Sequence, residues 1–292
     1  MANSKETGRC IFCGGNGLTK EHIWPDWLAA YAPKIGDSSK HTANFMKFDQ
    51  EGPPQEVDRR VNVKQGDPRS KKLRCVCRNC NGGWMSRLQS LVKPVLLDLV
   101  LGNSLGESAA GVRRVLTPEE QHLLSKWAVM FTMVAEHLDY KTIAVPTEQR
   151  RAFAETQCIP ENWRVWIGRY QGWRWHGNLI HRAAAVTQPG DAAARMNLQT
   201  SAFAVGKLFL LTWNTTVSGL DLIDFIPPRK AALEAIWPSG GAPCSQPTRI
   251  IFDFRFERNA SLFFEYLGLD VPLATQLPHQ QFASSAVVRP RD

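Results

Sequence analysis

Four cysteines, arranged in two pairs, are the most chemically informative residues of the chain. Cys10 and Cys13 form the first pair, and Cys77 and Cys80 form the second. A Cys-x-x-Cys turn directs both sulfurs at one ion, and four thiolates satisfy the tetrahedral coordination of zinc. The two pairs are separated by 63 residues, which is more than in a compact zinc ribbon. The sequence therefore predicts a structural Zn²⁺ site shared by the two pairs.

Three further cysteines bring the total to seven. Cys75 lies close to the second pair and competes with it as a ligand, but only Cys77 and Cys80 have the standard two-residue gap. Cys158 and Cys244 have no such neighbour. Free or unrelated thiols are the alternative interpretation of all seven.

A glutamate, a histidine and an asparagine follow the cysteine pairs at short range. Glu21 and His22 come soon after the first pair, and Asn81 directly follows Cys80. A histidine with a pKa of about 6.5 is a suitable general base at neutral pH. Carboxylate and amide oxygens are ligands for Mg²⁺. We therefore expect a catalytic Mg²⁺ or Mn²⁺ ion at Glu21 and Asn81, with His22 deprotonating water that attacks a phosphate.

Positive charge is concentrated around the second cysteine pair. The net charge of the chain is +8, and residues 1–100 carry 16 Lys and Arg against 10 Asp and Glu. Nine basic residues and a single acid lie between Arg59 and Arg87. Such a cluster attracts a polyanion through phosphate contacts that are independent of sequence. The candidate contacts are Lys71, Lys72, Arg74, Arg78 and Arg87, and an ordinary solvated surface is the alternative.

Together these motifs resemble those of the HNH endonucleases, which have a ββα-metal core. The matching order is Cys-x2-Cys, Glu-His-Ile-x-Pro and Cys-x2-Cys-Asn-x-Gly-Trp-Met-Ser, closest to the zinc-containing, endonuclease VII-like branch. The resemblance implies that His22 is the general base, that Glu21 and Asn81 bind the catalytic ion, and that the four paired cysteines bind a separate zinc. It covers about the first third of the chain.

The elements that would position these residues can be traced in the first third. Alternation and turn residues predict strands at 18–23, 44–48, 58–64 and 71–76. A short helix over 26–31, capped by Asp26, is expected after the first strand. A longer helix is expected to begin at Asn81 or Gly82 and to bend or restart at Pro94.

The remaining residues predict a second, larger unit. Glycine-rich residues 102–111 indicate a boundary, giving a zinc-stabilised ββα-metal module over 1–102 and an α+β domain over 103–292. Thr117, Pro118 and Glu120 form a capping-box signature at the start of a core helix. Another helix at 147–157 and strands at 163–170, 173–182, 196–204 and 205–212 suggest an antiparallel sheet, with short helices near 230–236 and 261–267.

The expected function is that of a metal-dependent endonuclease acting on nucleic acid, and DNA rather than RNA is the expected substrate. A non-catalytic zinc module that binds nucleic acid or protein is the alternative. The larger domain would position substrate, bind a regulatory partner or form a homodimer. The absence of a long apolar run or signal peptide predicts a cytoplasmic protein without a membrane partner.

Overall fold

A computed structural model describes most of the chain. It covers residues 8–31, 38–48, 55–65, 72–102, 115–172, 177–186, 196–217, 232–247 and 249–266. The fold is mixed α+β, as predicted, and its sheets are mainly antiparallel. Among the helices described, none combines the length and apolar character needed to cross a membrane.

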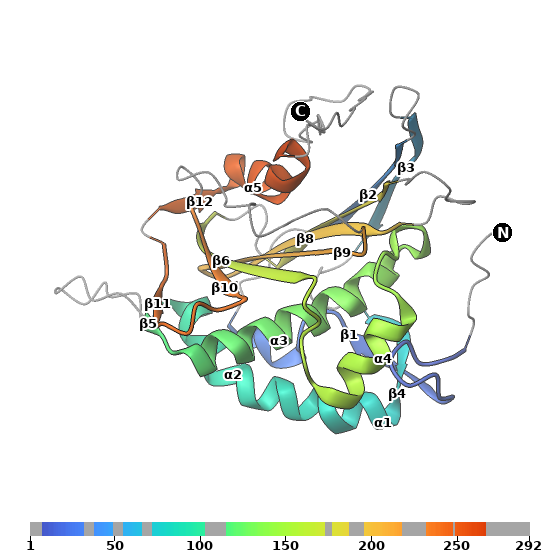
Figure 1. Cartoon of the computed structure of the whole chain (residues 1–292), viewed down its shortest axis with the longest axis horizontal. Coiled ribbons are helices and arrows are strands. Elements are labelled where there is room, and N and C mark those ends of the chain that lie inside the picture. Colours follow the sequence, from blue (N-terminus) through green and yellow to red (C-terminus); the bar gives the residue numbers. More distant parts are fainter. Residues whose placement is uncertain are drawn as a thin grey trace.

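A large sheet occupies the middle of the molecule (Figure 1). Its strands run in the order β10-β6-β9-β8-β7-β2-β3, and β12 also pairs with β6. Two of the pairings, β2 with β7 and β12 with β6, are parallel, which the sequence did not predict. The strand bounds are β2 Ser38–Phe48, β3 Gln55–Gln65, β6 Trp163–Gln171, β7 Asn178–Val186, β8 Leu198–Val205, β9 Leu208–Thr215, β10 Leu233–Trp237 and β12 Ile250–Phe252.

Helices lie on both faces of this sheet (Figure 1). Helices α2 (Ser86–Leu101) and α3 (Pro118–Ala135) lie on one side and α5 (Asp253–Tyr266) on the other. The capping box predicted for α3 is confirmed, because Thr117 Oγ1 accepts from Glu120 N and Glu120 Oε2 accepts from Thr117 N. Helix α4 (Thr147–Thr156) follows α3, and β5 (Val115–Leu116) pairs with β11 (Cys244–Ser245).

A second, two-stranded sheet carries the predicted site residues. Strand β1 (Leu18–His22) pairs antiparallel with β4 (Lys72–Cys77). The chain then enters α1 (Arg78–Cys80), a π-helical turn at Asn81–Met85, and α2. Pro94 lies inside α2, which continues to Leu101 without a restart.

One apolar core continues across residue 102, where the sequence predicted a domain boundary. It includes Phe12 and Trp24 from the N-terminal part and Phe131, Phe153 and Phe203 from the later part. The ring of Trp24 lies 4.8 Å from that of Phe131 and 5.9 Å from that of Phe203. The N-terminal segment therefore packs directly on the elements that follow it.

The turn between β8 and β9 fixes the end of α2 against the large sheet. Gly206 has a φ of 54°, and a Cβ added there would lie 2.2 Å from Val100 O. The neighbouring Lys207 N donates to the same carbonyl at 2.9 Å. Only glycine permits this close approach. Because Gly206 and Lys207 form the turn, β9 begins at Leu208 rather than at the predicted residue 205.

Two predicted helices differ from the structure. The helix expected near 230–236 is wrong, because Leu233–Trp237 forms β10 and pairs with β6, so sheet pairing overrides the helical propensity of Ala, Leu and Glu. Residues 26–31 contain a 3-10 helix at Asp26–Ala30, for which Pro25 stands at the N-cap position. Asp26 is thus not its cap. Residues 173–176 lie outside the described part.

Candidate zinc site and adjacent cleft

The four predicted cysteine ligands converge at one point. The sulfurs of Cys10, Cys13, Cys77 and Cys80 all lie within 4.8 Å of one another. Cys13 Sγ is 3.5 Å from Cys77 Sγ. Tetrahedral Zn–S bonds of about 2.3 Å place two sulfurs about 3.8 Å apart. The cluster therefore fits one metal ion, consistent with structural zinc, and it is the only group of this kind among the residues described.

Backbone contacts organise both cysteine pairs. Gly15 N lies 3.4 Å from Cys13 Sγ, and Cys80 N lies 3.5 Å from Cys77 Sγ, so each pair has an N–H group directed at a sulfur. These N–H groups stabilise thiolate ligands. Burial alone would raise the pKa of Cys77, but the Cys80 N–H and the sulfurs of Cys10, Cys13 and Cys80 favour its thiolate and lower the pKa to about 7.

Cys75 is excluded from the cluster. Its side chain is buried, and burial, together with the nearby Glu21 carboxylate, raises its thiol pKa to about 12. Its carbonyl accepts from Ile11 N at 2.9 Å, which joins β4 to the first cysteine pair. The competition between Cys75 and the second pair is therefore decided in favour of Cys77 and Cys80. Cys158 and Cys244 also lie outside the cluster.

A cleft of about 380 Å³ lies beside the cysteine cluster. Its lining includes Glu21 and His22 at the end of β1 and Asn81 at the start of the π-helical turn. The three predicted catalytic residues, which are up to 60 positions apart in the chain, therefore line the same depression. Other residues in the lining are Thr19, Lys20, Pro25, Asp26, Arg78, Gly82, Ser86 and Gln89.

Two hydrogen bonds join the strand and the helix across this cleft. Asn81 Nδ2 donates to Thr19 Oγ1 at 3.1 Å, and Gln89 Nε2 donates to Glu21 Oε1 at 3.4 Å. Thr19 Oγ1 in turn donates to Val76 O at 3.2 Å. Because the Asn81 amide nitrogen is engaged in this way, its amide oxygen is the atom with affinity for a cation.

Burial makes Glu21 unusual for a carboxylate at the edge of a cleft. Its side chain is 7% exposed, and desolvation raises its pKa to about 7 despite opposing hydrogen bonds from Gln89 and Asn81. Apolar residues of α3, among them Met130 and Phe131, line a small adjoining hollow behind it. A buried carboxylate with a raised pKa gains charge stabilisation when a cation binds.

His22 is poised to accept a proton. Its pKa is lowered from the usual value by burial and by the nearby positive charge of Lys72, and Asp26 only partly opposes this. The imidazole is therefore neutral at pH 7. His22 Nδ1 is 3.2 Å from Asp26 Oδ1, which is ion-pair distance without hydrogen-bond alignment. Nδ1 facing the carboxylate leaves Nε2 as the basic nitrogen.

Exposed positive charge borders the cleft. Lys72, Arg74, Arg78 and Arg87 are all solvent-exposed, and Arg78 contributes to the lining. Lys20, which the sequence analysis did not single out, also lies there. Lys71, the remaining predicted contact, lies outside the described residues. Lys20 and Arg78 can thus contact a polyanion in the cleft, and Lys72 lies near His22.

Comparison with known proteins gives no relative. No family model, no curated protein and no solved structure matches the chain. The site must therefore be interpreted from its own geometry.

Sequence reasoning missed three residues that support the site: Thr19, Asp26 and Gln89. Asp26 is four residues after His22, a spacing that would have been informative only if the turn after β1 were known. Gln89 lies eight residues after Asn81, but the π-helical turn between them has non-helical backbone at Gly83, so helical spacing could not place the two residues together from the sequence. Thr19 carries no signal of its own, because its contact with Asn81 depends on the β1–β4 pairing.

Proposed function

We propose that the protein is a divalent-metal-dependent endonuclease of the HNH type, which hydrolyses phosphodiester bonds in nucleic acid, and that its substrate is DNA rather than RNA. One observation carries this proposal. A glutamate, a histidine and an asparagine line a single cleft, whose lining includes residues on either side of Cys80 of the four-cysteine cluster. Zinc binding by the cysteines requires none of these three residues.

Each cleft residue has a distinct role in this reaction. Glu21 and Asn81 would hold Mg²⁺ or Mn²⁺ through oxygen atoms, and the bound ion would supply Lewis-acid stabilisation of charge on the phosphate oxygens. His22 accepts the proton of the attacking water at Nε2, while Asp26 stabilises the imidazolium that results. Gln89 holds the Glu21 carboxylate from the side of α2.

The order of elements supports the same proposal. Strands β1 and β4 pair antiparallel although the β2–β3 hairpin lies between them in the sequence, and β4 is followed directly by a helical segment. This pairing supports a ββα-metal module that carries an inserted hairpin. The histidine ends the first strand, as the resemblance of the sequence motifs implies. The asparagine lies three residues after the helical segment begins at Arg78, where the π-helical turn starts. The zinc would hold the two segments together at the point where β4 enters the helix.

Phosphate recognition follows from the exposed charges. Arg78 and Lys20 lie in the cleft itself, where they can contact the phosphates flanking the scissile bond. Lys72 and Arg74 are exposed on β4 and Arg87 on α2, and they would contribute affinity that does not depend on base sequence. A substrate bound in this way should dissociate as the salt concentration rises.

The proposal is tested by incubating the zinc-loaded protein with supercoiled plasmid, linear duplex and single-stranded RNA. The reactions contain Mg²⁺, Mn²⁺ or EDTA. We expect nicking or linearisation of DNA that requires the added ion and stops in EDTA. Tight, salt-sensitive DNA binding without any cleavage would instead support the non-catalytic binding module.

A further inference from the structure

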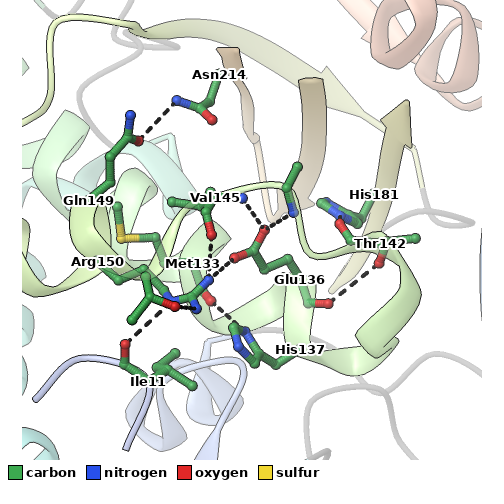
Figure 2. A network of polar contacts seen from close by, with 12 residues as sticks. Ile11, Met133, Glu136, His137, Thr142, Val145, Gln149, Arg150, His181 and Asn214 are labelled. Carbon is green, nitrogen blue, oxygen red and sulfur yellow. Dashed lines mark hydrogen bonds and ion pairs between the residues drawn. The ribbon is translucent and has the colours of Figure 1, made fainter. Parts of the chain in front are cut away.

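A buried ion pair joins helices α3 and α4 close to the cysteine cluster. Arg150 Nη1 lies 3.1 Å from Glu136 Oε1, and the two residues are 5% and 0% exposed. Glu136 Oε2 also accepts from the backbone N–H groups of Ala144 and Val145, at 3.0 and 3.2 Å. Figure 2 shows the carboxylate surrounded by these donors. The carboxylate is thus fully occupied by partners within its own helical region.

The guanidinium of Arg150 reaches beyond that region. Its Nε donates to Ile11 O at 3.3 Å, across 139 positions of sequence. Its other donors bond to Val145 O at 2.6 Å and to Thr147 Oγ1 at 3.0 Å (Figure 2). The planar fork is therefore fixed by three partners from the later part of the chain and offers its remaining edge to the N-terminal segment.

Ile11 lies between the two cysteines of the first pair. Its N–H donates to Cys75 O at 2.9 Å, and its carbonyl accepts from Arg150. Both polar groups of this residue are consequently held by other segments. The turn also closes on itself, because Gly14 N donates to Cys10 O at 2.9 Å. The position of Ile11 O therefore sets the tilt of the turn that presents Cys10 and Cys13.

Aromatic packing attaches the same turn to α4 independently of Arg150. The rings of Phe12 and Trp84 lie 4.9 Å apart, and those of Trp84 and Phe153 lie 5.8 Å apart, both edge to face. Phe153 is fully buried. These contacts hold the cysteine region on α4, so a loss of the Arg150 contact need not undock it. What Arg150 adds is a directional bond.

We propose that Arg150, held in place by Glu136, is a positioning residue for the metal site, fixing the first cysteine pair in the orientation needed to complete the four-sulfur cluster. A buried pair is costly to form, and apolar residues of similar size would often stabilise a core equally well. The pair nevertheless provides a directional hydrogen bond to Ile11 O, which apolar side chains cannot form. The zinc affinity of residues 10–80 thus depends on helices more than 50 residues further along the chain.

The inference rests on the zinc site included in the proposed function, but its test measures only metal binding. The main variant is Glu136→Gln with Arg150→Met, which removes both charges together and leaves no unpaired buried ion. The control is Glu155→Gln, which removes an exposed charge elsewhere on α4. Zinc affinity is measured by competition with a chromophoric chelator, and the geometry of the site by the absorption spectrum of the Co²⁺-substituted protein.

We expect the double variant to bind zinc about tenfold more weakly than the wild type. Its Co²⁺ bands, which report tetrahedral thiolate coordination, should shift or lose intensity at a temperature where circular dichroism shows a folded protein. Glu155→Gln should match the wild type in both measurements. Unchanged zinc affinity and an unchanged Co²⁺ spectrum in the double variant, with or without a lower Tm, would show that the pair only stabilises the fold and would overturn the proposal.

A second variant covers the case in which the double variant does not fold. Arg150→Lys keeps the positive charge beside Glu136 but loses the planar fork that reaches Ile11 and Val145 together. We expect it to weaken zinc binding several-fold and to alter the Co²⁺ spectrum. Wild-type zinc binding by Arg150→Lys would contradict the proposal. Neither result depends on whether the protein cleaves DNA.

Discussion

The Asn81 amide donates to the Thr19 hydroxyl at 3.1 Å, linking the first strand of the site to the start of the helix across 62 positions. The Thr19 hydroxyl in turn donates to Val76 O in the neighbouring strand β4. Both sides of the cleft are thus held by one threonine, which does not itself need to touch the substrate.

Removing the Thr19 hydroxyl should weaken binding of the catalytic ion. In Thr19→Val the Asn81 amide loses its bond to strand β1 at position 19, so we expect affinity for Mn²⁺ to fall roughly tenfold, as for other outer-shell contacts. Thr19→Ser keeps the hydroxyl and should bind Mn²⁺ as the wild type does. Isothermal titration of the zinc-loaded proteins measures both. Equal affinities in the valine and serine variants would mean that Thr19 does not position Asn81.

Binding of the catalytic ion should depend on pH through Glu21. Its pKa is raised to about 7, so below that pH a cation must displace a proton from the carboxyl group. We expect Mn²⁺ affinity to rise by up to about tenfold per pH unit between pH 5 and 7 and to level off above pH 8. Glu21→Gln should bind weakly with little pH dependence. A flat profile in the wild type would exclude Glu21 as the ligand.

The same carboxyl group should destabilise the protein when no catalytic ion is present. The folded-state pKa of Glu21 exceeds the ordinary value of 4.5, so its contribution is fully present below pH 4.5 and is lost as pH rises through about 7. At pH 8, without Mg²⁺ or Mn²⁺, Glu21→Gln should therefore raise the free energy of unfolding by about 1 to 3 kcal/mol.

Denaturant titrations at pH 4.5 and pH 8 provide the comparison. The stabilising effect of Glu21→Gln should largely disappear at pH 4.5, where the wild-type carboxyl group is protonated in the folded protein. A stabilisation of equal size at both pH values would indicate a packing effect instead.

Zinc should be lost selectively when a member of the sulfur cluster is replaced. Cys77→Ser removes one of four ligands, and we expect at least about a hundredfold loss of zinc affinity together with a lower Tm. Cys75→Ser changes a buried thiol only two residues away that lies outside the cluster. It should retain one equivalent of zinc, as measured by atomic emission after dialysis. Zinc loss in Cys75→Ser alone would contradict the assignment of the ligands.

Local signals in the sequence predicted much of the site. The spacing of the cysteines predicted the cluster that the structure contains, and placing Glu21, His22 and Asn81 beside the two pairs predicted their convergence in one cleft. Local signals suffice for this prediction because each cysteine pair needs only a tight turn. When the two pairs close around one ion, the residues that follow each pair in the sequence are brought together. The catalytic roles of these residues stay predictions.

Contacts between distant segments could not be predicted in the same way. The bond from Arg150 to Ile11 O is formed by a helix whose sequence looks like an ordinary polar surface helix. The pairing of β2 with β7 inserts a hairpin from between the two cysteine pairs into the large sheet, although the sequence suggested separate units. The residues of strand β10 were predicted as a helix. Local sequence could not reveal the strand, because it forms by pairing with β6, about 70 residues away.

The central claim is that His22 acts as the general base of a nuclease, and single-turnover cleavage by zinc-loaded His22→Ala tests it most directly. The matched control is His122→Ala, which removes a histidine on α3 that lies outside the lining of the cleft. We predict that Mg²⁺- or Mn²⁺-dependent DNA cleavage falls by about 10²- to 10⁴-fold in His22→Ala and is unchanged in His122→Ala. Cleavage by His22→Ala at the wild-type rate would contradict the account.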